Sequence, residues 1–244
     1  MIAVRTILPE TLDTLAADDP AAQRSRRDLR RIHRVMGTRT ILRRALRDCL
    51  LAANGNAPLR ILEIGAGDGT LLLGLARDMA VDLPLVALTL LDRQALLTPE
   101  TAAAYARLGW TVQMHTADIL DWAVDDGRQH AEDRSWDLIV ANLFLHHFTN
   151  PGLTDLFAAV ARRSRRFVAI EPRRSRMACI GSQLVGALGA NSVTREDAVL
   201  SVRAGFTGAE LQALWPQAPG WELREYPAGL FSHVFRAVRV GRAS

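Results

Sequence analysis

The sequence predicts an α/β protein built on a mostly parallel, doubly wound sheet with helices on both faces. Apolar runs of strand length alternate with helix-length segments from residue 59 to residue 172. The first of these runs ends in a glycine-rich turn, residues 65–69, at the place where open parallel sheets bind ligands. After residue 172 the alternation stops, and two closely spaced terminal strands predict an antiparallel hairpin.

The individual elements follow from apolar runs bounded by turn residues. Strands are expected at 59–65, 85–92, 110–118, 136–144 and 166–172, and the hairpin strands at 221–227 and 230–241. Helices are expected at 68–80, after a cap at Thr98, and at 150–164 with Asn150 as the cap. Residues 121–135 have no periodicity and predict a polar loop, while 175–190 and 194–215 predict short helices.

The first 57 residues predict a helical extension to the main domain. Residues 21–53 have apolar positions at helical spacing, and Gly37 is expected to separate two helices. We therefore divide the chain into an N-terminal extension or lid, 1–57, and a main domain, 58–244. Within the main domain, residues 175–215 are expected to form a helical insertion that covers the substrate.

Composition excludes several classes of protein. The 244-residue chain is 49% hydrophobic, enough for a large core, but no stretch reaches the length of a membrane span. Its two cysteines lie far apart and form no metal-ligand pattern, so we expect no metal site and a cytoplasmic location. All 30 basic residues are arginine, which excludes a catalytic lysine, and the arginine clusters lack the interleaved aromatics of nucleic-acid binders.

The glycine turn distinguishes between two kinds of nucleotide ligand. A dinucleotide fingerprint reads G-x-G-x-x-G and places a pyrophosphate at the helix N-terminus. Here the third glycine comes one residue early and Asp68 lies beside the helix start, where its carboxylate would repel a pyrophosphate. A nucleoside without phosphates fits better, and Glu63 at the strand end suits a cationic group.

These residues resemble the first motif, E-x-G-x-G-x-G, of class I S-adenosylmethionine-dependent methyltransferases. The resemblance covers roughly residues 59–172 and implies a Rossmann-like, seven-stranded fold with S-adenosylmethionine as the cofactor. It implies that Asp92, with Arg93 beside it, binds the ribose, and that Asn142 borders the methionine end. Asp118 would bind the adenine amino group, with Ile119 packed on the ring. The first-motif residues implied to bind the cofactor are Glu63, Gly65, Ala66, Gly67 and Gly69.

Two adjacent histidines, His146 and His147, follow the fourth predicted strand and would lie beside the methyl group. A base helps methyl transfer only if the acceptor must lose a proton, as a phenol does. We expect at most one of the two, preferably His147, to face the acceptor, because adjacent residues point in different directions. The alternative is that both only hydrogen-bond the loop backbone.

The expected function is methylation of a small apolar molecule, most simply of a phenolic or polyketide-type hydroxyl. The sequence also resembles methyltransferases that accompany bacterial type III polyketide synthases and act on phenolic lipids. Residues 142–145 lack the Asn/Asp-Pro-Pro-aromatic motif of amino-directed nucleic-acid methyltransferases. C-methylation of a quinone-like ring and a non-catalytic binding role are the alternatives. We expect a monomer or a homodimer without stable membrane insertion.

Overall fold

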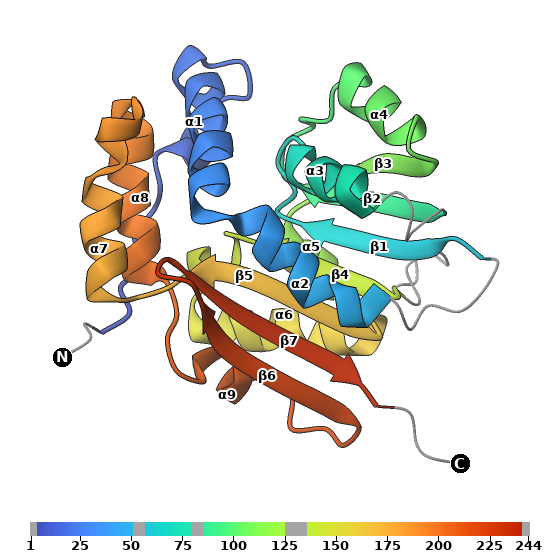
Figure 1. Cartoon of the computed structure of the whole chain (residues 1–244). Coiled ribbons are helices and arrows are strands. Elements are labelled where there is room, and N and C mark those ends of the chain that lie inside the picture. The colour runs from blue at the N-terminus through green and yellow to red at the C-terminus, as the bar shows by residue number, and fades with distance from the viewer. Residues whose placement is uncertain (1–3, 51–56, 80–84, 125–135, 241–244) are drawn as a thin grey trace.

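A seven-stranded sheet forms the centre of the computed structural model, which describes residues 4–50, 57–79, 85–124 and 136–240 (Figure 1). Its strands lie in the order β3-β2-β1-β4-β5-β7-β6. The first five strands are parallel and β7 is antiparallel to both of its neighbours. This confirms the predicted fold class. The strands are β1 (Leu59–Ile64), β2 (Val86–Asp92), β3 (Trp110–Thr116), β4 (Leu138–Asn142), β5 (Arg166–Pro172), β6 (Trp221–Ala228) and β7 (Ser232–Arg239).

The strand order reverses at β1, which lies between β2 and β4. Ile64 at the end of β1 pairs with Leu91 on one side and Ala141 on the other. The carboxyl ends of the central strands are therefore level with one another. In open α/β sheets, ligands bind in the crevice at this reversal.

Alternate residues of the central strands enter two separate cores, one on each face of the sheet. Ile61 lies in the core covered by α2 (Thr38–Leu50), α3 (Thr70–Met79) and α4 (Pro99–Ala106). Its neighbour Leu62 lies in the core covered by α5 (Ile119–Val124), α6 (Asn150–Arg163) and α9 (Glu210–Leu214). The N-terminal α2 contributes fully buried Leu42 and Leu46 to the first core.

Gly37 separates the two N-terminal helices, as predicted. Helix α1 (Pro20–Met36) begins at an Asp19 cap and ends at Gly37, whose φ of 67° lies in the left-handed region. Helix α2 begins at the next residue. The division of the chain at residue 57 stays a prediction.

A third layer stands near the carboxyl ends of the strands, where α1 packs against α8 (Ser192–Ala204) and α8 packs against α7 (Arg176–Gln183). Figure 1 shows these three helices side by side and apart from α3 and α4. The short 3-10 helix η4 (Val185–Leu188) lies between α7 and α8 in the chain and contacts all three helices. No helix among the described residues is both long and apolar enough to cross a bilayer.

Two local predictions were wrong. Residues 121–124 belong to α5, because Ile119, Trp122 and Ala123 are buried on one helical face while Asp121 interrupts the apolar pattern. The rest of the predicted loop, 125–135, lies outside the described residues. Helix α6 begins at Asn150, and its N-cap is Thr149.

Candidate functional site

The glycine turn after β1 requires left-handed backbone. Gly65 and Gly67 have φ values of 64° and 58°, a region that other residues rarely adopt. A Cβ on Gly65 would clash with the ring of Phe144, whereas a Cβ on Gly67 would meet no atom within 4 Å. The backbone at Gly67 is therefore open to a close approach by a ligand.

Asp92, the last residue of β2, links the ends of β1 and β2 through hydrogen bonds. Its Oδ2 accepts a hydrogen bond from the Gly67 amide at 2.9 Å, and its Oδ1 accepts one from the Gln94 amide at 2.9 Å. The Asp92 carbonyl also accepts a hydrogen bond from Ala117 after β3. The carboxylate is thus fixed between the glycine turn and the start of the next loop, with lone pairs left for a ligand.

The third and fourth strands bring two further predicted residues to the same edge. Asp118 follows β3, and its Oδ1 accepts a hydrogen bond from the Leu120 amide at 2.8 Å, beside buried Ile119. Asn142 ends β4 and is buried, and its Oδ1 has no hydrogen-bond partner among the described residues. A ligand with a donor group would satisfy this oxygen.

Glu63 is the most deeply buried acid of the turn region, with 3% of its surface exposed. Its Oε2 has no hydrogen-bond partner among the described residues. Burial raises the pKa of the Glu63 carboxyl well above its usual range, and the negative charges of Asp68 and Asp92 raise it further. A cationic group at this position would relieve the penalty of burying the charged carboxylate, so the site fits the cationic methionine portion of S-adenosylmethionine.

His146 is buried between two carboxylates. It lies in the 3-10 helix η3 (Leu145–His147), its Nδ1 is 2.8 Å from Glu171 Oε2, and its Nε2 is 3.2 Å from Glu10 Oε1. Burial lowers the pKa of the imidazole, but the hydrogen bonds with Glu10 and Glu171 outweigh burial and raise it to about 9. Both ring nitrogens of His146 are therefore engaged.

Glu171 at the end of β5 positions the whole η3 turn. Its fully buried carboxylate accepts hydrogen bonds from the backbone amides of Phe144, Leu145 and His146 at 3.0, 2.9 and 3.3 Å. Leu143, just before these residues, has a φ of 49° without being glycine. This acid holds a strained reversal of the chain at the carboxyl end of β4.

His147 lies beside His146 and is partly open, with 21% of its side chain exposed. Its Nδ1 is 3.1 Å from Asp13 Oδ2 in the 3-10 helix η1 (Leu12–Thr14). Burial raises the pKa of Asp13, but the hydrogen bond and charge of His147 outweigh it and the net pKa is lowered. A carboxylate that holds Nδ1 leaves Nε2 free, the orientation of a general base.

The N-terminal segment crosses the site and is tied to it at several points. Arg30 of α1 forms an ion pair with Asp68 at 2.7 Å, and Arg26 donates to Gln94 at 2.9 Å. Gln94 in turn donates to the Leu15 carbonyl at 3.0 Å. These contacts hold α1 over the glycine turn and the end of β2.

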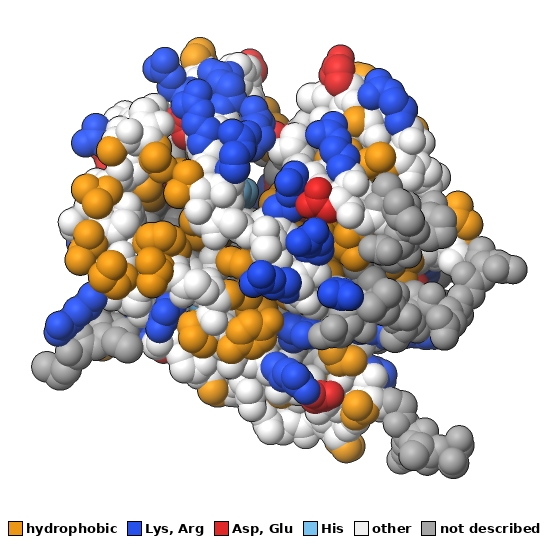
Figure 2. Space-filling model, in the orientation of Figure 1, with side chains coloured by type: hydrophobic (Ala, Val, Ile, Leu, Met, Phe, Trp, Pro, Cys, Tyr) orange, Lys and Arg blue, Asp and Glu red, His pale blue; other side chains and the backbone are white. Residues whose placement is uncertain are grey.

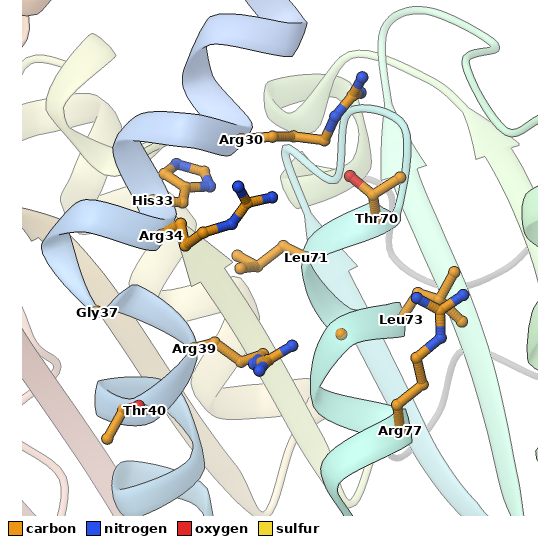
Figure 3. A pocket seen from close by; sticks show the side chains of 11 residues that line it. Arg30, His33, Arg34, Gly37, Arg39, Thr40, Thr70, Leu71, Leu73 and Arg77 are labelled. Atoms are coloured by element: carbon orange, nitrogen blue, oxygen red, sulfur yellow. The ribbon is translucent and has the colours of Figure 1, made fainter. Parts of the chain in front are cut away.

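A separate pocket of about 520 Å³ lies between the N-terminal helices and α3, lined in part by His33 and by Arg30, Arg34, Arg39 and Arg77 (Figure 3). None of the predicted cofactor residues lines it. Burial lowers the pKa of His33 to about 4 even though the charge of Asp68 raises it. Figure 2 shows arginines over α1 and beside the hollow between α1 and α3, while hydrophobic side chains gather over α7.

Sequence reasoning missed several residues of this region. Glu171 could have been noticed, because it is an acid within an otherwise apolar strand, RFVAIEP. Nothing in the pattern of residues 10–13 distinguishes Glu10 and Asp13 from solvated acids, because their partners lie more than a hundred positions away. Gln94 and Arg30 were missed for the same reason.

Comparison with known proteins finds a family similar to the central part of the chain. Residues 61–166 match a protein family described as "Methyltransferase domain". Among solved structures, the plantazolicin methyltransferase BpumL in complex with SAH is 15% identical, with 91% of each chain covered and a TM-score of 0.63. BpumL in complex with a monoazolic desmethylPZN analog and SAH is 17% identical over 91% of each chain, with a TM-score of 0.62.

A third structure, the CurJ carbon methyltransferase, is 18% identical and has a TM-score of 0.52. The alignment covers 83% of this chain and 54% of that one. No protein with a curated functional description matches the sequence. At these identities the solved structures establish a shared fold.

Proposed function

We propose that the chain is a class I S-adenosylmethionine-dependent methyltransferase that methylates a hydroxyl group on a small apolar acceptor. The observation that carries the proposal is the pair of His147 and Asp13 beside the end of β4. A histidine with one nitrogen held by a carboxylate suits the removal of a hydroxyl proton. A phenolic or polyketide-type hydroxyl is the acceptor that we favour.

The cofactor supplies an electrophilic methyl group, and the proposed cofactor site lies along the ends of β1 to β4. Asp92 would accept hydrogen bonds from the ribose hydroxyls, with Arg93 beside it, and Asp118 and Ile119 would hold the adenine. Glu63 and Asn142, whose buried oxygens have no partner among the described residues, would face the methionine end. The turn residues Gly65, Ala66, Gly67 and Gly69 would let the cofactor lie against the backbone.

Methyl transfer is an in-line displacement, so the enzyme must align the acceptor oxygen with the methyl carbon and exclude water. His147 would take the hydroxyl proton as the oxygen attacks. His146 would act as a positioning residue, because both of its nitrogens are already engaged by Glu10 and Glu171. Phe144, whose ring covers Gly65, would form an apolar wall between acceptor and cofactor.

The test of the cofactor site is calorimetry with S-adenosylhomocysteine. We expect saturable binding by the full-length protein and a clear loss of affinity in Asp92→Asn, which removes one acceptor oxygen. Asp78→Asn, on the far end of α3 from the turn, is the matched control and should bind normally. Absence of binding by the wild-type protein would refute the cofactor site.

The test of the acceptor is incubation with radiolabelled S-adenosylmethionine and a cell extract, followed by separation into organic-soluble, nucleic-acid and protein fractions. We expect the label in the organic phase, and His147→Ala should lower kcat by about 10²- to 10⁴-fold. His115→Ala on β3 is the control. Label in nucleic acid or protein would refute the substrate class.

C-methylation of a quinone-like ring is the second candidate. Support for it is limited to the shared fold with a carbon methyltransferase. In that case the acceptor carbon is activated by its own phenolate, so His147→Ala would change kcat little. The position of the new methyl group, read by mass spectrometry, separates the two reactions.

A further inference from the structure

Two histidines and a glutamate meet where the N-terminal segment crosses the end of β4. Glu10, His146 and His147 each offer one ligand atom, and the three atoms lie within 4.8 Å of one another. Nε2 of His146 and Oε1 of Glu10 are 3.2 Å apart. Two ligands that each lie about 2.1 Å from one metal ion at an angle near 100° have about this separation.

Both imidazoles have a carboxylate behind them. Glu171 lies 2.8 Å from Nδ1 of His146, and Asp13 lies 3.1 Å from Nδ1 of His147. Histidines that bind metals almost always donate their other ring N–H to such an outer partner, which fixes the ring and leaves Nε2 for the metal. The same arrangement occurs here twice, on adjacent residues.

The surroundings favour a cation. Four carboxylates lie in this region, those of Glu10, Asp13, Glu171 and Asp197. Burial raises the pKa of Asp197, and the negative charges of Glu10 and Asp13 raise it further. Two arginines act on these acids, since Arg5 has a charge interaction with Glu171 and Arg93 has one with Asp13. The four named carboxylates therefore have two named arginines acting on them.

We propose that Glu10, His146 and His147 bind one divalent first-row metal ion, such as zinc, manganese or iron(II). Two imidazoles and a carboxylate suit these ions and leave coordination positions open. The site is reachable, because 12% of the Glu10 side chain and 21% of the His147 side chain are exposed. The sequence predicted no metal site, because Glu10 is 136 positions from His146.

The inference goes beyond the proposed function and changes how its acceptor site works. A metal ion held by His147 would occupy the imidazole lone pair that a free base would use. An ion held by Glu10, His146 and His147 would act as a Lewis acid that stabilises the deprotonated acceptor oxygen, and the hydroxyl proton would pass to water. The ion would also link Glu10 of the N-terminal segment to the histidines that follow β4.

The test is metal binding by the full-length protein after treatment with a chelator and its removal. Calorimetry with zinc chloride should give one ion per chain, and cobalt(II) should give the visible absorption of an imidazole-ligated site. Magnesium, which prefers oxygen ligands, should bind far more weakly. Asp13→Asn should weaken zinc binding by about 10- to 100-fold, and Glu10→Gln and His147→Ala should weaken it more.

The control is His115→Ala, which should bind zinc as the wild-type protein does. Glu10→Gln keeps a side chain of the same size beside Ser201 and His146, and circular dichroism checks that each variant is folded. The proposal is overturned if the wild-type protein takes up no stoichiometric ion, or if Glu10→Gln and His147→Ala bind zinc with unchanged affinity.

Parallel calorimetry with S-adenosylhomocysteine and the methyl-transfer assay separate this proposal from the proposed function. Protein that binds S-adenosylhomocysteine and transfers methyl groups but takes up no zinc overturns only the metal site. Protein that binds zinc through the named residues but methylates no small molecule overturns only the function.

Discussion

His33 on α1 and His146 on η3 have opposite pKa shifts. Burial lowers the pKa of His33 to about 4, and its Nε2 has no hydrogen-bond partner among the described residues. Burial also acts on His146, but Glu10 and Glu171 hydrogen-bond both of its nitrogens and raise its pKa to about 9. The presence of a hydrogen-bonded carboxylate, not the depth of burial, decides the charge of each ring.

The charged groups around the two histidines differ as well. Residues 10–13 bring acids to a pair of histidines, whereas α1 and α2 bring arginines to the face of α3 (Figure 3). The Glu171 carboxylate near His146 is buried and hydrogen-bonded, whereas Arg30 and Arg39 near His33 are more open to solvent. Charged contacts around His146 should therefore contribute more to stability than those around His33.

The largest effect is expected for Glu171→Ala. The substitution leaves three backbone amides and the charged His146 without their buried acceptor. We therefore expect the free energy of unfolding to fall by about 3–5 kcal/mol. Urea denaturation measures this loss. Glu196→Ala, at an exposed acid on α8, is the control and should change stability by less than about 0.5 kcal/mol. Equal losses would contradict the comparison.

The pH dependence tests the other histidine. Because the pKa of His33 is about 4 when folded and 6.5 is its ordinary value, the unfolded chain binds the extra proton and stability falls as pH drops from 6.5 to 4. The contribution of His33 to the free energy of unfolding is up to about 3 kcal/mol, and partial exposure of its ring lowers this contribution.

His33→Gln should flatten this acid limb of the stability curve. Urea midpoints measured at several pH values for the two proteins give the comparison directly. An acid limb of unchanged slope in His33→Gln would show that His33 is not buried as a neutral ring.

The smallest effect is expected for Arg30→Gln. Its ion pair with Asp68 is short, at 2.7 Å, but 44% of the Arg30 side chain is exposed. Such pairs contribute about 0–1 kcal/mol and are screened by salt. We expect a loss in this range at low salt that shrinks at high salt. A larger loss that salt does not reduce would assign Arg30 a role in the fold of the glycine turn.

Most of the sheet could be predicted because its strands are continuous apolar runs, buried on both faces. Strand β4 was predicted too long, 136–144 against Leu138–Asn142, because apolar Leu143 and Phe144 lie in the reversal that Glu171 holds. Apolar character alone does not distinguish a strand from a buried turn.

The glycine turn, Asp92 at the end of β2 and Asp118 after β3 lie at one edge of the sheet, as predicted, since parallel strand ends must meet there. The carboxylates around His146 and His147 could not be predicted, because they come from segments far apart in the chain. Local patterns report helices, strands and caps. They contain no information about which distant acid a buried histidine will meet.

The N-terminal crossing also constrains the order of folding. Arg5 donates to the Ala204 carbonyl across 199 positions, and Glu10 accepts from Ser201 across 191. These two contacts can form only after α8 has been synthesised. Closing so long a loop is entropically costly, so docking of this segment is expected late, after the sheet has formed. The edge of the sheet with the glycine turn is therefore expected to form before residues 5–10 dock against α8.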